Sequence, residues 1–199
     1  MKKYISPLVL LAFLSIILSC KKDSGNVNPS TGTELLQNGN LDGTTTNWFS
    51  GFESPAGSNP NNYVLELSED FSVSPKKSIK IQCDKVNNTA SFCHYNQAFS
   101  TTGLKAGAIL TLNAKIKGVN LVGQGLSIAI RGDKTGASSS VFFRTTQGVS
   151  PITGTFDFKE FSVSLESYEG NADRIIVFIV FLPQTTGTAY IDDISLKSL

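Results

Sequence analysis

Apolar and polar residues alternate along most of this 199-residue chain. A period of two residues places successive side chains on opposite faces of the backbone, which indicates β-strands with one buried face. After the first twenty residues, no segment carries apolar residues at convincing helical spacing. The alternation predicts nine strands, at residues 63–67, 78–83, 92–99, 109–117, 126–131, 141–145, 156–165, 175–182 and 189–196.

Turn-forming residues such as Gly123-Gln124-Gly125 separate these segments. Short strands at near-regular spacing, with glycine-rich turns and no helices between them, predict an all-β fold, an antiparallel two-sheet jelly-roll sandwich. Residues 175–182 are apolar on both parities, so we expect a central strand covered on both faces. Residues 44–62 and 68–77 are expected to form long irregular loops, which in compact domains tend to be functional or to carry an ion.

The amino-terminal residues form a pattern of their own. Lys2 and Lys3 precede an apolar stretch at residues 8–18, which predicts a secretory signal peptide over residues 1–19. The stretch is too short to cross a hydrocarbon core about 30 Å thick, which needs about twenty apolar residues.

The end of this signal, Ile17-Leu18-Ser19-Cys20, resembles the bacterial lipoprotein box. The following Lys21-Lys22-Asp23 resembles the export signals of surface lipoproteins in Bacteroidetes-type bacteria. The resemblance implies that Cys20 is acylated and anchors the protein to the outer membrane or cell surface, while a periplasm-facing position stays open. The alternative is a signal peptide cleaved near an incidental cysteine.

The remaining chain divides into a tether and one domain. Residues 20–33 are almost free of apolar side chains and predict a flexible linker behind the lipid-bearing cysteine. Residues 34–199 suffice for one domain with a full core. The chain has 17 basic and 16 acidic residues, and without Lys2 and Lys3 the balance is 15 to 16. There is thus no basic field for nucleic acid, and we expect a neutral partner rather than an ionic one.

Cys83 and Cys93 remain in a chain that leaves the reducing cytosol. They lie in two predicted strands joined by the turn-rich residues 84–89, and a hairpin would place them opposite each other. A disulfide there would add about 2–3 kcal/mol. The alternative is a pair of free thiols in the core.

Two motifs at the ends of the domain carry a resemblance to a known family. The domain opens with Asn38-Gly39-Asn40-Leu41-Asp42-Gly43 and Asn47-Trp48, and it closes with Ala189-Tyr190-Ile191-Asp192-Asp193-Ile194-Ser195-Leu196. Together with residues 77–81, 95–99 and 107–112, in the family's order, they resemble family 4 and 9 (CenC-type) carbohydrate-binding modules and their galactose-binding-like jelly-roll relatives. Leu41 departs from the family's usual Phe.

The resemblance implies a structural calcium ion that bridges the first and last strands. Carried over, Asp42 and Asp192 become its ligands, with backbone carbonyls near residues 74–77 completing an oxygen shell of the kind that calcium prefers. The alternative is that both carboxylates cap turns or accept backbone N–H bonds.

A sugar site needs flat apolar faces for stacking and polar groups for the hydroxyls. If Cys93 and Phe99 point inward, then Phe92, His94 and Asn96 share the outer face and form the best candidate groove. The family often presents a glutamine from this strand, which would instead place Gln97, and with it Tyr95, in the groove after a bulge.

Further candidates lie on other segments. Arg131 and Arg144 are possible donors to sugar hydroxyls or acids from neighbouring strands. Trp48 either stacks on a sugar or packs beneath the first long loop, where its indole N–H would need a backbone acceptor.

Catalysis has little support in the sequence. His94 is the one histidine, and no Ser-His-Asp or Cys-His set has a specific motif. Glycosidase chemistry would require two facing carboxylates, and Glu53, Glu66, Glu69 and Asp70 are the conceivable sources.

The sequence therefore predicts a non-catalytic, lipid-anchored surface module that binds a glycan, in the company of neighbouring glycan-uptake proteins. The alternatives are a ligand-free structural or protein-interaction module, which predicts that Phe92, Tyr95 and Trp48 are buried and that no groove exists, and a small glycan-active hydrolase.

Overall fold

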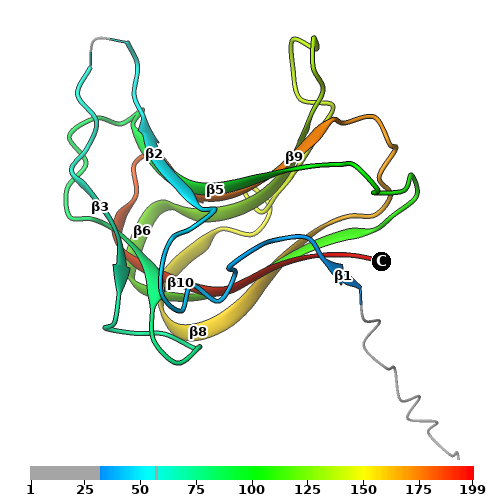
Figure 1. Cartoon of the computed structure of the whole chain (residues 1–199). Coiled ribbons are helices and arrows are strands. Elements are labelled where there is room, and N and C mark those ends of the chain that lie inside the picture. The colour runs from blue at the N-terminus through cyan, green and yellow to red at the C-terminus, as the bar shows by residue number, and fades with distance from the viewer. Residues whose placement is uncertain (1–31, 57) are drawn as a thin grey trace, which may run out of the picture. The chain divides into compact units, whose positions relative to one another are not determined.

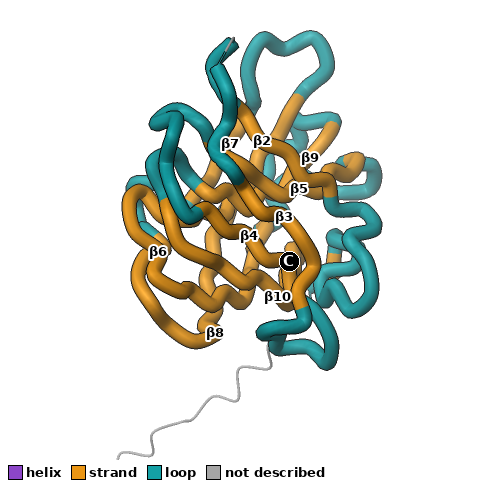
Figure 2. The backbone as a smooth tube through the Cα atoms, turned by 90° about the vertical axis from the view of Figure 1, so that its left-hand side faces the viewer, coloured by secondary structure: helices purple, strands orange, loops and turns teal. Residues whose placement is uncertain are grey.

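A computed structural model describes residues 32–56 and 58–199, which are built of strands and loops (Figure 2). The strands are β1 (Thr33–Glu34), β2 (Phe49–Glu53), β3 (Tyr63–Ser68), β4 (Ser78–Cys83), β5 (Phe92–Ser100), β6 (Leu110–Asp133), β7 (Phe142–Thr145), β8 (Ile152–Leu165), β9 (Arg174–Phe181) and β10 (Thr186–Ser198). The predicted signal peptide, Cys20 and all but the last two residues of the tether lie outside the described residues. Within the described part, no helix is long and apolar enough to span a membrane.

The strands pack as two antiparallel layers that share the long strand β6 (Figure 1). The first sheet has the order β3-β4-β10-β6-β8, and the second has the order β2-β5-β9-β6-β7. The first half of β6 belongs to one sheet and residues 126–133 to the other. The chain turns this corner at Gly123, whose φ of 88° and close approach to the carbonyl of Gln184 leave no room for a Cβ atom. The architecture is the predicted two-sheet sandwich.

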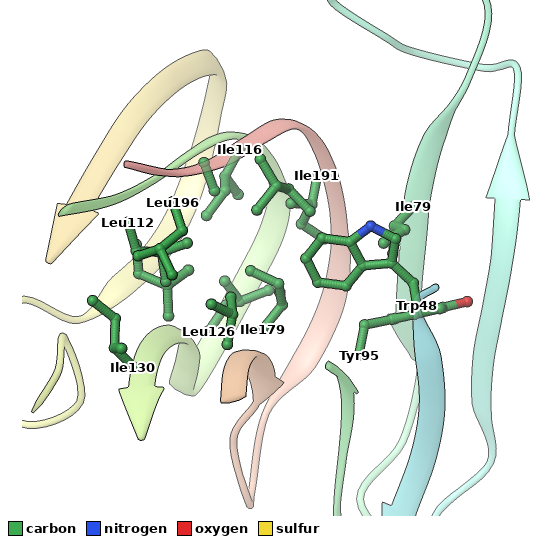
Figure 3. Close-up of a cluster of buried hydrophobic side chains, with 14 of the residues drawn as sticks. Trp48, Ile79, Tyr95, Leu112, Ile116, Leu126, Ile130, Ile179, Ile191 and Leu196 are labelled. Carbon is green, nitrogen blue, oxygen red and sulfur yellow. The ribbon is translucent and has the colours of Figure 1, made fainter. Parts of the chain in front are cut away.

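The inward faces of both sheets meet in one aliphatic core. Figure 3 shows the indole of Trp48 and the ring of Tyr95 among the isoleucine and leucine side chains of this cluster. The most deeply buried members alternate along β4, β6, β9 and β10, as the period-two pattern requires. Each such side chain contributes about 1.5–3 kcal/mol when it leaves water. Core burial therefore fixes which face of each strand remains available for a site.

All nine predicted strands are present, and the structure adds two details. Residues 109–117 and 126–131 belong to one continuous strand, β6, because the glycine corner bends the chain without ending its pairing. Strand β2 lies inside the predicted irregular stretch 44–62, so that prediction is wrong for residues 49–53. β1 begins at Thr33, one residue before the predicted domain start.

The predicted hairpin between the cysteines is also wrong. β4 pairs with β3 and β10, whereas β5 pairs with β2 and β9, so the intervening residues carry the chain from one sheet to the other. Cys83 and Cys93 are buried free thiols, and Cys83 Sγ lies 3.4 Å from the carbonyl oxygen of Lys85. The structure therefore corrects the predicted disulfide in favour of two thiols in the core.

The two ends of the domain lie side by side, as the resemblance implied. Leu35 N donates to Leu196 O at 2.9 Å, and Ile194 N donates to Gly39 O at 2.8 Å. A Cβ atom on Gly39 would collide with the carbonyl of Ile194, which explains why the opening motif carries glycine there. The opening and closing sequence motifs are therefore hydrogen-bonded to each other where the two ends of the domain meet.

Candidate functional site

A mainly apolar hollow lies on the outer face of the second sheet. It is a groove of about 510 Å³ across β2, β5, β9, β6 and the residues that follow β7 and β9. Its apolar lining consists of Phe92, Phe143, Phe178, Val180, Leu182 and Pro183. Its polar lining consists of Glu53, His94, Arg131 and Gln147. The groove thus combines aromatic rings with a few polar groups, which is typical of small-ligand sites.

Strand register explains how residues far apart in sequence meet in this groove. His94 lies opposite Gly51 on one side and opposite Val180 on the other. On the next strands, Arg131 lies opposite Phe143. Because directly paired residues point to the same face of a sheet, these side chains form cross-strand rows over the groove floor.

His94 occupies the centre of this arrangement. A Cβ atom on Gly51 would lie 3.2 Å from its Cε1 atom, so glycine on β2 makes room for the imidazole. The ring also packs edge-on against Phe178, with 5.8 Å between the ring centroids. Burial lowers the pKa of His94, and the nearby Glu53 carboxylate partly opposes that shift. At neutral pH the imidazole is therefore neutral and offers one donor and one acceptor.

Arg131 supplies the cation of the groove. Its Nη2 atom lies 2.8 Å from Oδ2 of Asp133, and this hydrogen bond holds the pKa of the Asp133 carboxyl below its usual range. Its Nε atom is buried without a hydrogen-bond partner among the described residues. The guanidinium is thus positioned by one carboxylate and still has donors to offer.

Three residues predicted to contact a sugar lie in the interior instead. Trp48 is 5% exposed, and its Nε1 donates to the carbonyl of Asn38 at 3.0 Å, which is the alternative placement beneath the loop. Tyr95 is 3% exposed and faces the core. Gln97 is 4% exposed and joins the first loop, because its side chain accepts from Gln37 N and donates to Gln37 O, both at 2.8 Å. The predictions for Trp48, Tyr95 and Gln97 are therefore corrected.

The other predicted residues, with the exception of Arg144, lie on or near the outer face. The structure brings Phe92, His94 and Arg131 together in the groove, while Asn96 shares their face and donates to the carbonyl of Phe49 at 3.4 Å. Arg144 lies opposite Ile130 and so points to the other face of the sheet. That the groove residues bind a glycan stays a prediction.

Sequence reasoning missed part of the lining. Phe143 and Phe178 were not proposed as ligand contacts, although Phe143 is 46% exposed. Periodicity did not single out Phe143, because its place beside Arg131 depends on the register of β6 against β7. Phe178 was expected to be covered, because every residue of the predicted strand 175–182 is apolar, but its outer face contributes to the groove lining. Gln147 and Pro183 lie in turns, where periodicity gives no information.

The residues of the expected calcium site fit such an ion poorly. Asp192 is fully buried, and its carboxylate accepts from Val73 N at 2.8 Å, from Ser74 N at 2.9 Å and from Asp193 N at 2.8 Å. Backbone N–H groups aimed at both oxygens compete with a cation for the same lone pairs. Asp42 is different, since its Oδ1 atom is buried without a partner. Among the described residues, no group of three acidic, histidine or cysteine side chains could hold a metal.

The carboxylates considered for hydrolysis do not meet in one cleft. Glu53 is the one carboxylate that lines the groove. Glu66 and Asp70 flank Lys80 on the opposite sheet, at 3.2 Å and 3.7 Å, and Glu69 pairs with Lys77 at 3.3 Å. The described lining of the groove therefore lacks the facing pair that glycoside hydrolysis requires.

Solved structures resemble this sandwich closely enough to define its fold. A family 11 carbohydrate-binding module from a cellulosomal cellulase of Clostridium thermocellum has a TM-score of 0.55 at 11% identity, over 85% of this chain and 97% of that one. A family 4 carbohydrate-binding module has a TM-score of 0.53 at 16% identity, over 83% of this chain and all of that one. The fold is that of carbohydrate-binding modules.

A larger protein contains the same fold. The enzymatically active domain of tailspike protein 4 from bacteriophage CBA120 has a TM-score of 0.61 at 13% identity, over 83% of this chain. The match spans about a fifth (21%) of that chain. At the level of sequence, no family model and no curated protein matches this chain. The carbohydrate-binding-module fold is therefore supported by structure alone.

Proposed function

We propose that the chain is a non-catalytic module that binds a glycan in the groove on the outer face of the second sheet. The observation that carries this function is the juxtaposition of three phenylalanine rings with His94, Arg131 and Glu53 in one open hollow. Aromatic faces stack on the apolar faces of sugar rings, and the polar groups hydrogen-bond to hydroxyls. The fold shared with carbohydrate-binding modules also favours glycan binding, while the groove residues carry the argument because fold alone does not define function.

The same proposal places the module on a membrane surface through its amino terminus. An acylated Cys20 would hold the protein on the outer membrane or cell surface, and residues 21–31 would give the domain reach from the lipid. Such a module would present a glycan to neighbouring uptake proteins. Metabolic labelling with a radioactive or clickable fatty acid tests the anchor, because Cys20→Ser should abolish incorporation.

A glycan array tests the binding function. The full chain carrying Cys20→Ser is compared with the same chain carrying Phe92→Ala, which removes a ring from the groove. The matched control is Phe52→Ala, since Phe52 is 57% exposed and lies outside the groove lining. We expect Phe92→Ala to weaken retention and Phe52→Ala to preserve it. A folded protein that binds no glycan on the array contradicts the proposal.

One observation favours a second function. Phe49 and Phe52 are 68% and 57% exposed on β2, which is the edge strand of the second sheet. Exposed aromatic rings on an unpaired edge are suited to contact another protein. This is the protein-interaction alternative, and the array control Phe52→Ala also serves to test it in pull-down experiments with outer-membrane extracts.

A further inference from the structure

A second hollow continues the groove past Arg131. It has a volume of about 410 Å³ and lies between the end of β6, the start of β9 and the loop that follows β6. Arg131 lines both hollows. A polymer lying along the apolar groove therefore reaches this second cleft without leaving the surface of the sheet.

The cleft has an unbalanced charge. Its lining includes three cations, Arg131, Lys134 and Arg174, against one carboxylate, Asp133. Nη2 of Arg131 and Nη2 of Arg174 both contact the same oxygen, Oδ2 of Asp133, at 2.8 Å and 3.1 Å. Each guanidinium has five N–H donors, so one shared oxygen leaves most of them free. Nε of Arg131 also has no hydrogen-bond partner among the described residues, but because it is buried it is not a donor that a ligand reaches.

A second carboxylate, Asp173, interacts electrostatically with Lys134, so three cations face two carboxylates and one positive charge remains in excess. Oδ2 of Asp173 accepts from Thr135 N at 2.7 Å and so holds the turn after β6. The lining also includes three consecutive exposed serines, 138–140, whose hydroxyls add neutral donors. Two guanidinium forks, a lysine and hydroxyls around one hollow are the groups that recognise a carboxylate or sulfate oxygen.

We infer that this cleft binds an anionic substituent of the glycan, so that the ligand is an acidic polysaccharide bearing uronic-acid carboxylates or sulfate esters. The inference rests on the proposed function, since the apolar groove would hold the sugar rings and the cleft would bind the anionic groups attached to them. It departs from the neutral partner that the near-zero net charge favours, because the balance of the whole chain says nothing about local clustering. Arg131 lies near the end of β6, Lys134 directly follows that strand, and Arg174 lies at the start of β9. The pairing of β6 with β9 brings these three cations together.

The first experiment compares ligands that differ in charge alone. Isothermal titration measures binding of the full chain carrying Cys20→Ser to polygalacturonate and to its methyl-esterified form, which lacks the carboxylate charge. A second pair, dextran sulfate and dextran, tests sulfate as the source of the anion. We expect at least one acidic member to bind about tenfold tighter than its neutral partner. Equal or tighter binding of the neutral members overturns the acidic-ligand inference and leaves the glycan function intact, whereas no binding to any glycan overturns both.

The second experiment locates the charge recognition. Arg174→Gln and Lys134→Gln remove cations from the cleft, while Lys197→Gln removes one exposed cation from β10, in the other sheet. We expect Arg174→Gln to weaken binding of the preferred acidic glycan about tenfold, without changing binding of its neutral partner, and Lys197→Gln to have no effect. An equal loss in Arg174→Gln and Lys197→Gln would mean unspecific attraction and would overturn the cleft as the site. Circular dichroism spectra confirm that each variant is folded.

Discussion

The guanidinium carbon of Arg131 lies 5.2 Å from the centroid of the Phe178 ring. This contact joins the floor of the apolar groove to the cationic cleft beyond it, because the arginine stacks on the ring and bonds to Asp133 at the same time. The ring thereby has two functions, which are to present a face to a ligand and to keep the guanidinium in place. Substitutions at Phe178 should therefore affect binding far more than folding.

Two phenylalanines of β9 provide a matched test of this division. Phe178 faces the groove, whereas Phe181 is fully buried in the core. Phe178→Ala should weaken glycan binding about tenfold or more with a modest loss of stability. Phe181→Ala should cost about 3–5 kcal/mol of unfolding free energy. Urea unfolding and titration calorimetry on both variants measure the two effects, and a larger stability loss in Phe178→Ala would contradict the assignment of faces.

His94 should make stability depend on pH in the mildly acidic range. Its pKa is lowered in the folded protein by burial, so the unfolded chain binds the proton more readily than the native chain does. The stability that depends on neutral His94 is then fully present above the unperturbed pKa of about 6.5 and declines as the pH falls below it. We expect thermal unfolding at pH 5 to occur at a lower temperature than at pH 7.

The matched variant for this prediction is His94→Gln, which keeps polar groups in the groove and does not titrate. The difference between the wild-type and variant unfolding free energies should shrink as the pH falls from 7 to 5. Depressed carboxyl pKa values, such as that of Asp133, act at lower pH, so the two contributions are separable. A difference that stays constant with pH would show that His94 does not carry the effect.

Trp48 should act on stability and not on binding. Trp48→Phe removes the indole N–H that Asn38 O accepts and leaves a small cavity in the core. The expected cost is about 1–3 kcal/mol of unfolding free energy. Affinity for any glycan that the groove binds should be unchanged in the folded variant. A selective loss of affinity, measured by titration, would restore Trp48 as a ligand contact.

The strand pattern was predictable because burial imposes the period-two alternation on every core strand. The same pattern left two parities for β5, and the structure has the one in which Phe92, His94 and Asn96 point outward, not the one that places Gln97 and Tyr95 in the groove. The failures have a common physical cause. Periodicity says which face a residue shares with its neighbours on one strand, but it contains no information about which strands pair across the sandwich.

Pairing therefore decided the features that the sequence left open. The residues after Cys83 cross between sheets instead of forming a hairpin, so the two cysteines lie on strands that do not pair. The meeting of Arg131 with Phe178 and Arg174 likewise depends on the register of β6 against β9. Burial of Trp48, by contrast, could be anticipated as an alternative, because an indole beneath a loop needs a backbone acceptor and a loop supplies one.

Calcium should have little effect on this domain if the carboxylate of Asp192 keeps its hydrogen bonds. The unfolding temperature in excess EDTA should equal that in millimolar calcium chloride, because the N–H groups of Val73, Ser74 and Asp193 already satisfy the carboxylate. Asp192→Ala should cost about 2–4 kcal/mol, because it leaves buried donors unpaired. A clear rise in unfolding temperature with calcium, lost in Asp42→Asn, would instead support the ion site that the family resemblance implies.

The two core cysteines should be chemically inert in the native protein. Burial raises the pKa of both thiols, most strongly that of Cys93, so neither carries the thiolate needed for reaction. In the chain carrying Cys20→Ser, an aromatic disulfide reagent should release no colour under native conditions. It should titrate two thiols per chain after denaturation without reductant. A denatured chain with no reactive thiol would show that Cys83 and Cys93 are joined, and that the crossing between the sheets allows a bond that the strand pairing alone does not provide.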